Sequence, residues 1–520
     1  MINNNSIAKK SLIISILLGS SSLLGLIRES SIAYMFGASS NTDAYFVAMM
    51  IPSLFISTIS SSITSTFVTV YSGYIVNKDI YQAQKSSNVI LTSLFIILGL
   101  LYFILMFFTP TVVSLFAPDY SLQKLDLTSD LTRILLPNLL FGGLLGILTG
   151  INNSNGSFIA PASVGLILNI VVIISTFTLG EIWGIYGLAL GTTLGIVAQF
   201  ILQIPSAYKH GLRYKFIIDL HDPGFREVFK MVLPFILAAS VGQLNTIIDR
   251  SFATSLSDGV VTALYFAGKI TFLPQIIFSG AVSMVALPLL AKYVSLKDWD
   301  NTVKSLINGI RLLVLLLIPS AVIIILLNVP IVEILFQRGS FTTSDKDMTA
   351  SLMPYILGAM FFGGIVGLLN NIYFAMKHTK YLVLTSIIGV VIKLLMSYLL
   401  INSMKQWGLV LADSISGFTI MLMQIVGLFT VLKFHKRTSI PFKDIFNFIK
   451  NIIISSMLMF IIIYFVNKFT LNILSDDILL IIKVVLLTIL GLTVFLVGLY
   501  FLKVSEIRSF INKKLKIRNY

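Results

Sequence analysis

The chain has 520 residues, of which 56% are hydrophobic and only 11% are charged, whereas an average soluble domain has about 25% charged residues. This composition excludes an ordinary soluble protein and indicates a helical protein that crosses a membrane many times. The absence of cysteine excludes disulfide frameworks, thiolate metal sites and cysteine nucleophiles.

Apolar segments of about 20 residues or more, the length that a bilayer core requires, follow one another along the chain. The first is expected to be a membrane helix rather than a cleavable signal, because it continues past Arg28 to Phe36 without a small-residue cleavage site. We therefore predict an all-α polytopic membrane protein with about fourteen transmembrane helices. They centre on residues 11–36, 44–73, 87–109, 131–152, 158–180, 183–206, 228–252, 259–291, 305–328, 350–376, 380–402, 407–432, 448–468 and 478–502.

Lysine and arginine concentrate in alternate loops, which explains the net charge of +15 better than nucleic-acid binding does. The segment 207–228 and the C-terminal tail are basic, whereas the segment 109–130 carries mostly acidic charges. The positive-inside rule then predicts that both termini lie in the cytoplasm. Anionic lipid headgroups are the expected partners of the basic loops.

A sequence pattern recurs on either side of the segment 207–228. Arg28 is followed by Tyr45-Phe46-Val47-Ala48, and Arg250 is followed by Tyr265-Phe266-Ala267-Gly268. Two lobes inserted in the same direction imply a pseudo-twofold axis along the membrane normal, as in alternating-access transporters; chance similarity between apolar segments is the alternative. We predict an N-terminal lobe at 1–207, a C-terminal lobe at 208–437, and two additional helices with a basic cytoplasmic tail at 438–520.

Three basic residues, Arg28, Arg250 and Lys269, lie within predicted spans one, seven and eight. A charge at bilayer depth costs at least a few kcal/mol, so it normally faces a partner or a watery cavity. A cluster of cations suits a multiply anionic group such as a diphosphate, and we predict that these residues bind one. Alternatively, Arg250 pairs with an acid elsewhere, and Arg28 pairs with Asp43 or with its neighbour Glu29. Adjacent helix residues point about 100° apart, which disfavours Glu29.

The second span is unusually rich in hydroxyl groups, with nine serines and threonines between residues 53 and 66. They cover every face of a helix, so at least one row should meet water or substrate. We predict that Asp43, Ser53, Ser57 and Ser61 line a partly wet cavity that can bind sugar hydroxyls. Close packing of helices through small polar residues is the alternative.

Asp249, Lys393 and Asp413 lie at membrane depth on spans seven, eleven and twelve. They should be mutually paired, because an unpaired buried charge is far costlier than a paired one. The set is either a fixed salt-bridge node or a coupling site where protonation breaks the pair. The sequence has no Walker phosphate loop and no zinc-binding His-Glu-x-x-His, and we predict no enzymatic activity, no cofactor and no metal site.

Several of these stretches resemble the MurJ/MviN family of lipid II flippases, within the multidrug/oligosaccharidyl-lipid/polysaccharide flippase superfamily. The stretches that carry the resemblance are residues 25–28, 36–38 and 42–48, Asp249-Arg250 with 265–267, and 335–342. The resemblance implies export of an undecaprenyl-diphosphate-linked glycan across a bacterial plasma membrane by alternating access. The saccharide would cross a central cavity, and the last two spans would form a groove for the polyprenyl tail.

The resemblance also implies the partners, which are the lipid-linked glycan and membrane lipids. We expect a monomer, either alone or within a cell-envelope synthesis complex. Lipid II is the favoured substrate, and the alternative is another polyprenyl-linked saccharide such as an O-antigen, capsule or exopolysaccharide unit. A multidrug antiporter of the same superfamily is disfavoured, because cationic drugs require an acidic or aromatic cavity.

The chain departs from the family pattern in two respects. The family's cavity usually carries several arginines, of which this chain keeps Arg28, whereas Ser22, Ile56 and Lys269 stand at other positions. Some members are expected to bind sodium between spans seven, eleven and twelve. Here Asp249 matches that pattern, but Lys393, Ser397 and Asp413 occupy the other positions. A lysine ammonium would take the place of the cation, so we predict that sodium is not bound there and that protons or the membrane potential drive transport.

Overall fold

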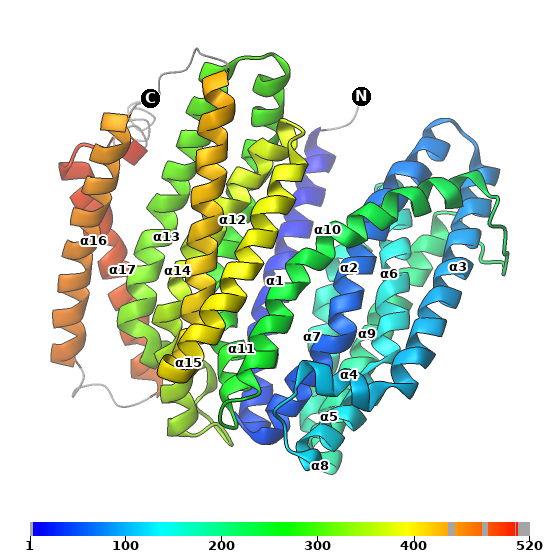
Figure 1. The fold of residues 1–520 in the computed structure, drawn as a ribbon, viewed down its shortest axis with the longest axis horizontal. Coiled ribbons are helices and arrows are strands. Elements are labelled where there is room, and N and C mark those ends of the chain that lie inside the picture. Colours follow the sequence, from blue (N-terminus) through cyan, green and yellow to red (C-terminus); the bar gives the residue numbers. More distant parts are fainter. Residues whose placement is uncertain (1–3, 435–441, 471–476, 505, 508–520) are drawn as a thin grey trace. The chain divides into compact units, whose positions relative to one another are not determined.

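The computed structural model describes residues 4–434, 442–470, 477–504 and 506–507, and the regular secondary structure within these ranges is entirely helical (Figure 1). The helices are α1 (Asn4–Phe36), α2 (Ser40–Val76), α3 (Ile80–Phe107), α4 (Thr109–Phe116), α5 (Leu122–Leu135), α6 (Pro137–Ser154), α7 (Ile159–Phe177), α8 (Leu179–Trp183), α9 (Ile185–Lys209), α10 (Pro223–Ala253), α11 (Val260–Thr271), α12 (Leu273–Ser295), α13 (Trp299–Phe336), α14 (Thr343–Ala375), α15 (Thr379–Phe434), α16 (Phe442–Thr470) and α17 (Asp477–Phe501).

The chain forms two compact units. Unit 1 comprises residues 1–262 and 336–345, and unit 2 comprises residues 263–335 and 346–520. These units are defined by contacts between residues, whereas the lobes at 1–207 and 208–437 were inferred from the sequence repeat. The lobe boundaries therefore stay a prediction.

Eleven helical stretches of the described residues are long and apolar enough to cross a membrane. One of them, in α15, contains the two predicted spans 380–402 and 407–432, which meet at a break in helical geometry at Lys405. The long helices α1 and α10, of 33 and 31 residues, correspond to the remaining predicted spans one and seven. The prediction of an all-α polytopic protein with about fourteen spans is confirmed.

Two predicted spans are divided by proline. α5 ends at Leu135 and Pro137 begins α6. Likewise, α11 ends at Thr271, and α12 carries Pro274 in its first turn. Proline has no amide hydrogen to give to the preceding turn, but its fixed φ suits the first turn of a new helix. The segment 109–130, which the sequence indicated as a loop, contains α4 and the first part of α5.

In unit 1, α2 packs closely on α6 through a row of glycines. Gly142, Gly146 and Gly150 are spaced four residues apart and so lie on one face of α6. A Cβ atom on Gly146 would lie 2.9 Å from the carbonyl oxygen of Ser60, and one on Gly150 would lie 2.6 Å from the Phe67 ring. Small residues allow such an approach between membrane helices, where van der Waals packing replaces the hydrophobic effect as the driving force.

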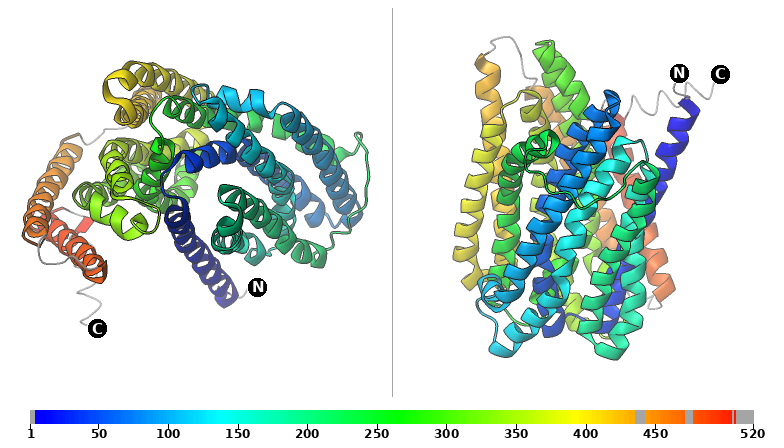
Figure 2. Two further views of the ribbon diagram at one scale, coloured as in Figure 1. Left: turned by 90° about the horizontal axis from the view of Figure 1, so that it is seen from below. Right: turned by 90° about the vertical axis from the view of Figure 1, so that its right-hand side faces the viewer.

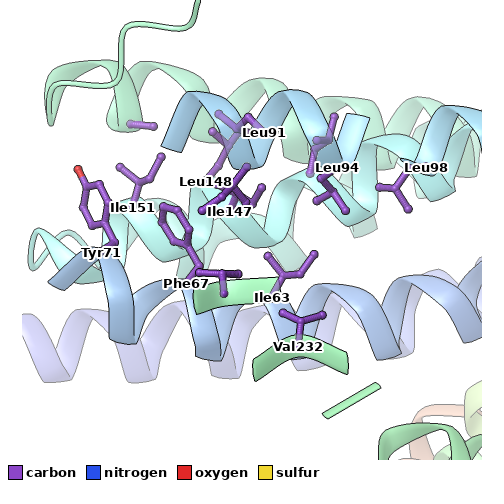
Figure 3. Close-up of a cluster of buried hydrophobic side chains, with 14 of the residues drawn as sticks. Ile63, Phe67, Tyr71, Leu91, Leu94, Leu98, Ile147, Leu148, Ile151 and Val232 are labelled. Carbon is purple, nitrogen blue, oxygen red and sulfur yellow. The ribbon is translucent and has the colours of Figure 1, made fainter. Parts of the chain in front are cut away.

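The apolar core of unit 1 is formed mainly by α2, α3 and α6 (Figure 3). Phe67 is 1% exposed and stacks on Tyr71, with ring centroids 5.2 Å apart. Leu98 from α3 and Ile147 from α6 are fully buried. Elsewhere in unit 1, α7 packs against both α1 and α9 (Figure 2). The orientation of α2, and with it the direction of its hydroxyl groups, is set mainly by its packing on α5, α6 and α10.

A separate core in unit 2 joins α13 to the last two helices. Ile452, Met459 and Ile463 from α16 are fully buried, as is Leu327 from α13, and Leu487 from α17 is 3% exposed. The two helices that have no counterpart in the sequence repeat are therefore packed on the rest of unit 2 by interdigitating apolar side chains.

Candidate functional site

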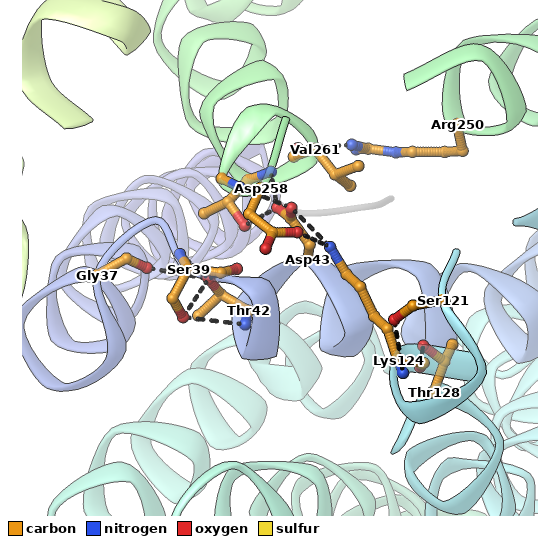
Figure 4. A network of polar contacts seen from close by, with 12 residues as sticks. Gly37, Ser39, Thr42, Asp43, Ser121, Lys124, Thr128, Arg250, Asp258 and Val261 are labelled. Carbon is orange, nitrogen blue, oxygen red and sulfur yellow. Dashed lines mark hydrogen bonds and ion pairs between the residues drawn. The ribbon is translucent and has the colours of Figure 1, made fainter. Parts of the chain in front are cut away.

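A buried polar network at the start of α2 centres on Asp43, which is 1% exposed (Figure 4). The carboxylate accepts hydrogen bonds from the Gly259 amide at 2.7 Å, from the Thr262 amide at 2.8 Å and from the Thr262 hydroxyl at 2.7 Å. Lys124 Nζ lies 3.3 Å from Asp43 and 2.6 Å from Asp258. The negative charge is thus fully enclosed by donors, which is what a buried carboxylate requires.

Helix capping positions Asp43 in the first turn of α2. Ser39 and Thr42 form a capping box at this end of the helix, in which each side chain bonds the backbone amide of the other residue. The Thr42 hydroxyl also donates to the carbonyl of Gly37 at 3.1 Å. An acidic residue in the first turn is favoured by the helix dipole, so the local sequence already places a carboxylate here.

Two of the segments that carry the family resemblance, residues 36–38 and 336–342, contact each other within unit 1. The Ser340 amide donates to the Tyr34 carbonyl at 2.7 Å, and the Ser340 hydroxyl donates to the Met35 carbonyl at 3.0 Å. Gly37 has a φ of +62°, and a Cβ there would lie 2.4 Å from the Ser340 carbonyl oxygen. Gly339 has a φ of +59°, and a Cβ there would lie 2.3 Å from the Tyr34 oxygen. Both glycines are thus required by conformation and by space.

The sequence did not single out Lys124, which lies in the mostly acidic segment 109–130. The side chain is 10% exposed and also lies over the Tyr120 ring, with Nζ 4.2 Å from the centroid. Burial raises the pKa of the Tyr120 phenol. A signal was present, since Lys124 shares a helical face with Thr128, Leu131 and Leu135 at spacings of three and four. Those three residues are fully buried.

The hydroxyl groups of α2 lie on several faces, and those of Thr58, Ser62 and Thr66 are buried. Ser60 and Thr64 lie against α6, where the Thr64 hydroxyl donates to the Gly146 carbonyl at 3.0 Å. An exposed row lies elsewhere on the helix at intervals of four residues; its members are Ser53, Ser57, Ser61, Ser65 and Thr69. We call this row the hydroxyl face of α2. Each hydroxyl donates to a carbonyl three or four residues earlier, which leaves its oxygen able to accept a further hydrogen bond.

Of the predicted cavity-lining residues, Ser53, Ser57 and Ser61 thus lie on the hydroxyl face. Ser57 is also contacted by Gln243 of α10, whose amide nitrogen lies 3.1 Å from the serine oxygen. Asp43 differs from the other three, because it is buried in its own network. α2 therefore carries both hydroxyls that pack against other helices and hydroxyls that are exposed.

Arg28 lies on α1 with 18% of its side chain exposed, and it forms an ion pair with Glu29. The expectation that Glu29 is a poor partner for Arg28 is wrong, because a long guanidinium side chain can fold back to a neighbour whose own side chain is only 2% exposed. The alternative partner Asp43 is instead bound by Lys124. One carboxylate oxygen of Glu29 contacts Arg28.

The other two predicted diphosphate ligands have different surroundings. Arg250 is half-buried and donates to the Val261 carbonyl at 2.8 Å, next to the Asp43 network (Figure 4). Lys269 belongs to unit 2, where it is exposed and lies 5.0 Å from the centroid of the Tyr265 ring. The assignment of these three cations to one diphosphate site stays a prediction.

The structure brings together two of the three residues predicted as a coupling or salt-bridge node. Lys393 is 1% exposed and forms an ion pair with Asp413, which is 30% exposed. Ser397, one helical turn from Lys393, is fully buried. Asp249 is half-buried on α10 of unit 1, and its membership of the node stays a prediction. Among the described residues, no group of three or more His, Cys, Asp and Glu side chains is placed to hold a metal ion.

Unit 2 contains a partly open cavity of about 560 Å³ between α13, α14, α15 and α16. Its wall is apolar except at one point, where Arg311 enters it. Arg311 pairs with Glu506 at 3.1 Å and lies over the Phe448 ring, 5.2 Å from the centroid. The lining residues include Val314, Phe361 and Ile449. The cavity could hold part of a long hydrocarbon chain.

The chain is similar to known proteins over almost its whole length. A family model described as lipid II flippase MurJ matches residues 32–485. A probable lipid II flippase MurJ from Rickettsia prowazekii (strain Madrid E) is 28% identical, with 93% of this chain and 95% of that protein covered. One from Vibrio cholerae is 27% identical, with 81% and 82% covered.

Solved structures agree with this relationship. A lipid II flippase MurJ in an inward closed conformation superimposes with a TM-score of 0.78 at 26% identity, covering 93% of this chain and 98% of that one. An inward-facing multidrug resistance transporter of the MATE family, in the MOP superfamily, has a TM-score of 0.67 at 16% identity, which shows a common fold only. The chain is therefore a multi-pass membrane protein that belongs to the lipid II flippase MurJ family.

Proposed function

We propose that this protein moves lipid II, a glycan linked to undecaprenyl diphosphate, from the inner to the outer leaflet of a bacterial plasma membrane by alternating access. The observation that carries the proposal is the match of the MurJ family model to residues 32–485. Both termini would lie in the cytoplasm, in line with the basic residues of the alternate loops. The protein would act as a transporter without catalysing a reaction, as a monomer or within an envelope-synthesis complex.

The hydroxyl face of α2 supports passage of a polar headgroup. Each of the five exposed hydroxyls in this row keeps an oxygen that can accept a further hydrogen bond, and lipid tails offer no donor for it. A water-filled cavity satisfies them, and sugar hydroxyls can then replace water at little cost. We therefore assign Ser53, Ser57 and Ser61 to the wall along which the saccharide moves.

Arg28 is the proposed principal contact of the diphosphate, with Arg250 and Lys269 as further ligands. A guanidinium can contact phosphate oxygens through two parallel hydrogen bonds. The ion pair with Glu29 holds Arg28 while the cavity is empty, and an arriving diphosphate would compete with Glu29 for it. That competition keeps a charge at membrane depth paired throughout the cycle, which limits its cost.

The apolar cavity of unit 2 is the proposed site of the polyprenyl tail. Its volume of about 560 Å³ lies within the range of about 300–1,000 Å³ that encloses a drug-sized ligand, so it would take part of the chain while the rest stays in lipid. Arg311 at its wall is paired with Glu506 and keeps its aliphatic stem toward the cavity, as long basic side chains commonly do.

Energy coupling is proposed to depend on protons or the membrane potential. The Lys393 ammonium already neutralises Asp413, so a sodium ion at that place would meet repulsion from the lysine. Transport by the purified protein should therefore be unchanged when potassium replaces sodium. Sodium-dependent transport that disappears in an Asp249→Ala variant would contradict this proposal.

The function is tested by complementation in a bacterium depleted of its own lipid II flippase. The wild-type chain should restore growth, whereas Arg28→Ala should insert in the membrane but leave lipid II on the inner leaflet. Arg133→Ala is the matched control, because Arg133 makes an exposed ion pair with Asp130 at 3.0 Å, and such pairs contribute about 0–1 kcal/mol.

Two results would separate the proposals. Full rescue by Arg28→Ala would refute the diphosphate site while leaving the function intact. In the other result, the wild-type chain inserts normally without restoring growth, and instead restores a surface polysaccharide in a strain that lacks the exporter of that polysaccharide. This result would show that the substrate is another polyprenyl-linked saccharide rather than lipid II.

A further inference from the structure

The connection between α9 and α10, residues 210–222, contains neither helix nor strand and runs along the outer side of α3 (Figure 1). We call it the α9–α10 strap. It begins by following one row of α3 side chains. Gln84 donates to the Gly211 carbonyl at 2.9 Å, and Asn88 donates to the Arg213 carbonyl at 3.0 Å. Because Gln84 and Asn88 are one helical turn apart, the strap advances along the helix axis.

The tip of the strap meets the next residue of the same row. The hydroxyl oxygens of Thr92 and Tyr214 lie 3.2 Å apart, and the Ile217 amide donates to the Thr92 hydroxyl at 3.4 Å. From Gln84 to Thr92 is eight residues, or about 12 Å along a helix. The strap thus extends well along α3 before it turns back.

The return of the strap is fixed by charged groups. Lys85 pairs with Asp219 at 2.8 Å, and the hydrogen bond from Lys85 holds the pKa of the Asp219 carboxyl below its usual range. Asp222 is 1% exposed and accepts from Gln82 at 2.7 Å and from Ser86 at 2.8 Å, while it also caps α10. Both arms of the strap are therefore tied to α3.

The sequence of α3 locates the tip relative to the bilayer. Residues 80–88 are largely polar, and residues 89–107 are almost wholly apolar. Those apolar residues span about 28 Å at 1.5 Å per residue, close to the thickness of about 30 Å of a bilayer core. Thr92 lies four residues, about 6 Å, inside the apolar part. The tip therefore reaches the boundary between headgroups and acyl chains.

The strap presents apolar side chains at every second position. Tyr214, Phe216, Ile218 and Leu220 are 53%, 65%, 58% and 59% exposed. These four exposed side chains lie at the tip and on the returning arm of the strap, and we call them its apolar row. A soluble surface would gain nothing from such a row, but an interfacial segment gains by burying it about 5–10 Å into the headgroup and acyl boundary.

Exposed cations surround this row. Lys209, Arg213 and Lys215 precede or interrupt it, and Arg226 and Lys230 follow in the first turns of α10. Each lysine or arginine near an anionic leaflet contributes about 1 kcal/mol to membrane attraction. We propose that the α9–α10 strap is an interfacial anchor, whose apolar row inserts into the leaflet while its cations bind anionic lipid headgroups.

The absence of cysteine allows a direct test with the full chain. Phe216→Cys and Ile218→Cys are spin-labelled in vesicles of phosphatidylcholine with phosphatidylglycerol, and label collisions with oxygen and with a water-soluble nickel chelate are compared. Asn77→Cys, exposed in the turn between α2 and α3, is the aqueous control. The labels at 216 and 218 should favour oxygen and the label at 77 should favour nickel. Retained transport activity establishes that each labelled protein is folded.

The binding of the strap's cations to anionic headgroups is tested by adding Lys215→Gln to the Phe216→Cys protein. The same proteins are also measured in vesicles of phosphatidylcholine alone. Neutralising one lysine should lower the insertion equilibrium about fivefold in anionic vesicles and leave it unchanged in neutral ones. Nickel access at 216 equal to that at 77 would overturn the anchor. Protection from both reagents would show that protein covers the row, and equal insertion in both kinds of vesicle would show that anionic headgroups are not recognised; either result overturns the proposal as stated.

Discussion

The hydrogen bond from Thr262 to Asp43 can be removed almost isosterically by Thr262→Val. The hydroxyl lies 2.7 Å from the carboxylate of a residue that is 1% exposed. A hydrogen bond to a charged group contributes about 1.5–3 kcal/mol. Since every 1.4 kcal/mol is tenfold in an equilibrium constant, local opening around Asp43 should become about ten- to a hundredfold more frequent. The Gly259 and Thr262 amides, which also donate to Asp43, report that opening.

The measurement is hydrogen–deuterium exchange of a peptide that covers residues 256–264, under conditions where exchange follows the opening equilibrium. Thr271→Val on the same helix is the matched control, because that hydroxyl is buried and has no hydrogen-bond partner among the described residues. It should exchange like the wild type. Unchanged protection in Thr262→Val, or an equal loss in both variants, would refute the view that the Asp43 carboxylate holds this segment.

Three further substitutions test the packing, the hydroxyl face and the ion pair. Gly146→Ala should lower thermal stability in detergent, because its Cβ would lie 2.9 Å from a backbone oxygen of α2. Gly99→Ala is the control and should be neutral or slightly stabilising, because the space around Gly99 is open. Equal effects of the two substitutions would contradict the close packing of α2 on α6. Ser61→Leu should abolish transport while leaving expression and melting temperature intact, and Ser61→Thr should retain transport; normal flipping by the leucine variant would remove Ser61 from the cavity wall. Asp413→Asn should lower the free energy of unfolding by up to about 3 kcal/mol, the lower end for a buried ion pair, because the aspartate is partly exposed. The same substitution should cost much less in a Lys393→Met background. Additive effects of the two substitutions on thermal unfolding would show that the two residues are not coupled.

The transmembrane spans were predictable because they depend on the local sequence. A run of about 20 apolar residues is a property of one segment, and the spans predicted along the chain correspond to helices of the structure. The breaks at Pro137 and Pro274 could also be anticipated, since proline acts on its own helix. The family motifs were visible for the same reason, because they are short and contiguous.

The role of those motifs was not predictable from the sequence. Gly37 and Gly339 are some three hundred positions apart, and only the fold shows that each makes room for the backbone next to the other. The network of Asp43 likewise joins residues more than eighty positions apart along the chain. Periodicity can place Lys124 on a buried helical face, but it contains no information about which acid lies opposite.

The sequence by itself determined that α2 carries hydroxyls on every face, and it left packing and a wet cavity as alternatives. The tertiary structure decided that both are present, because the glycine row of α6 occupies one face and leaves the row from Ser53 to Thr69 exposed. It also decided that Arg28 pairs with Glu29, against expectation from helical geometry. For α2, helix periodicity fixes which side chains share a face, whereas the helix packed against that face depends on contacts between distant segments. For Arg28, the reason is the length of its side chain, which lets the guanidinium reach the adjacent Glu29.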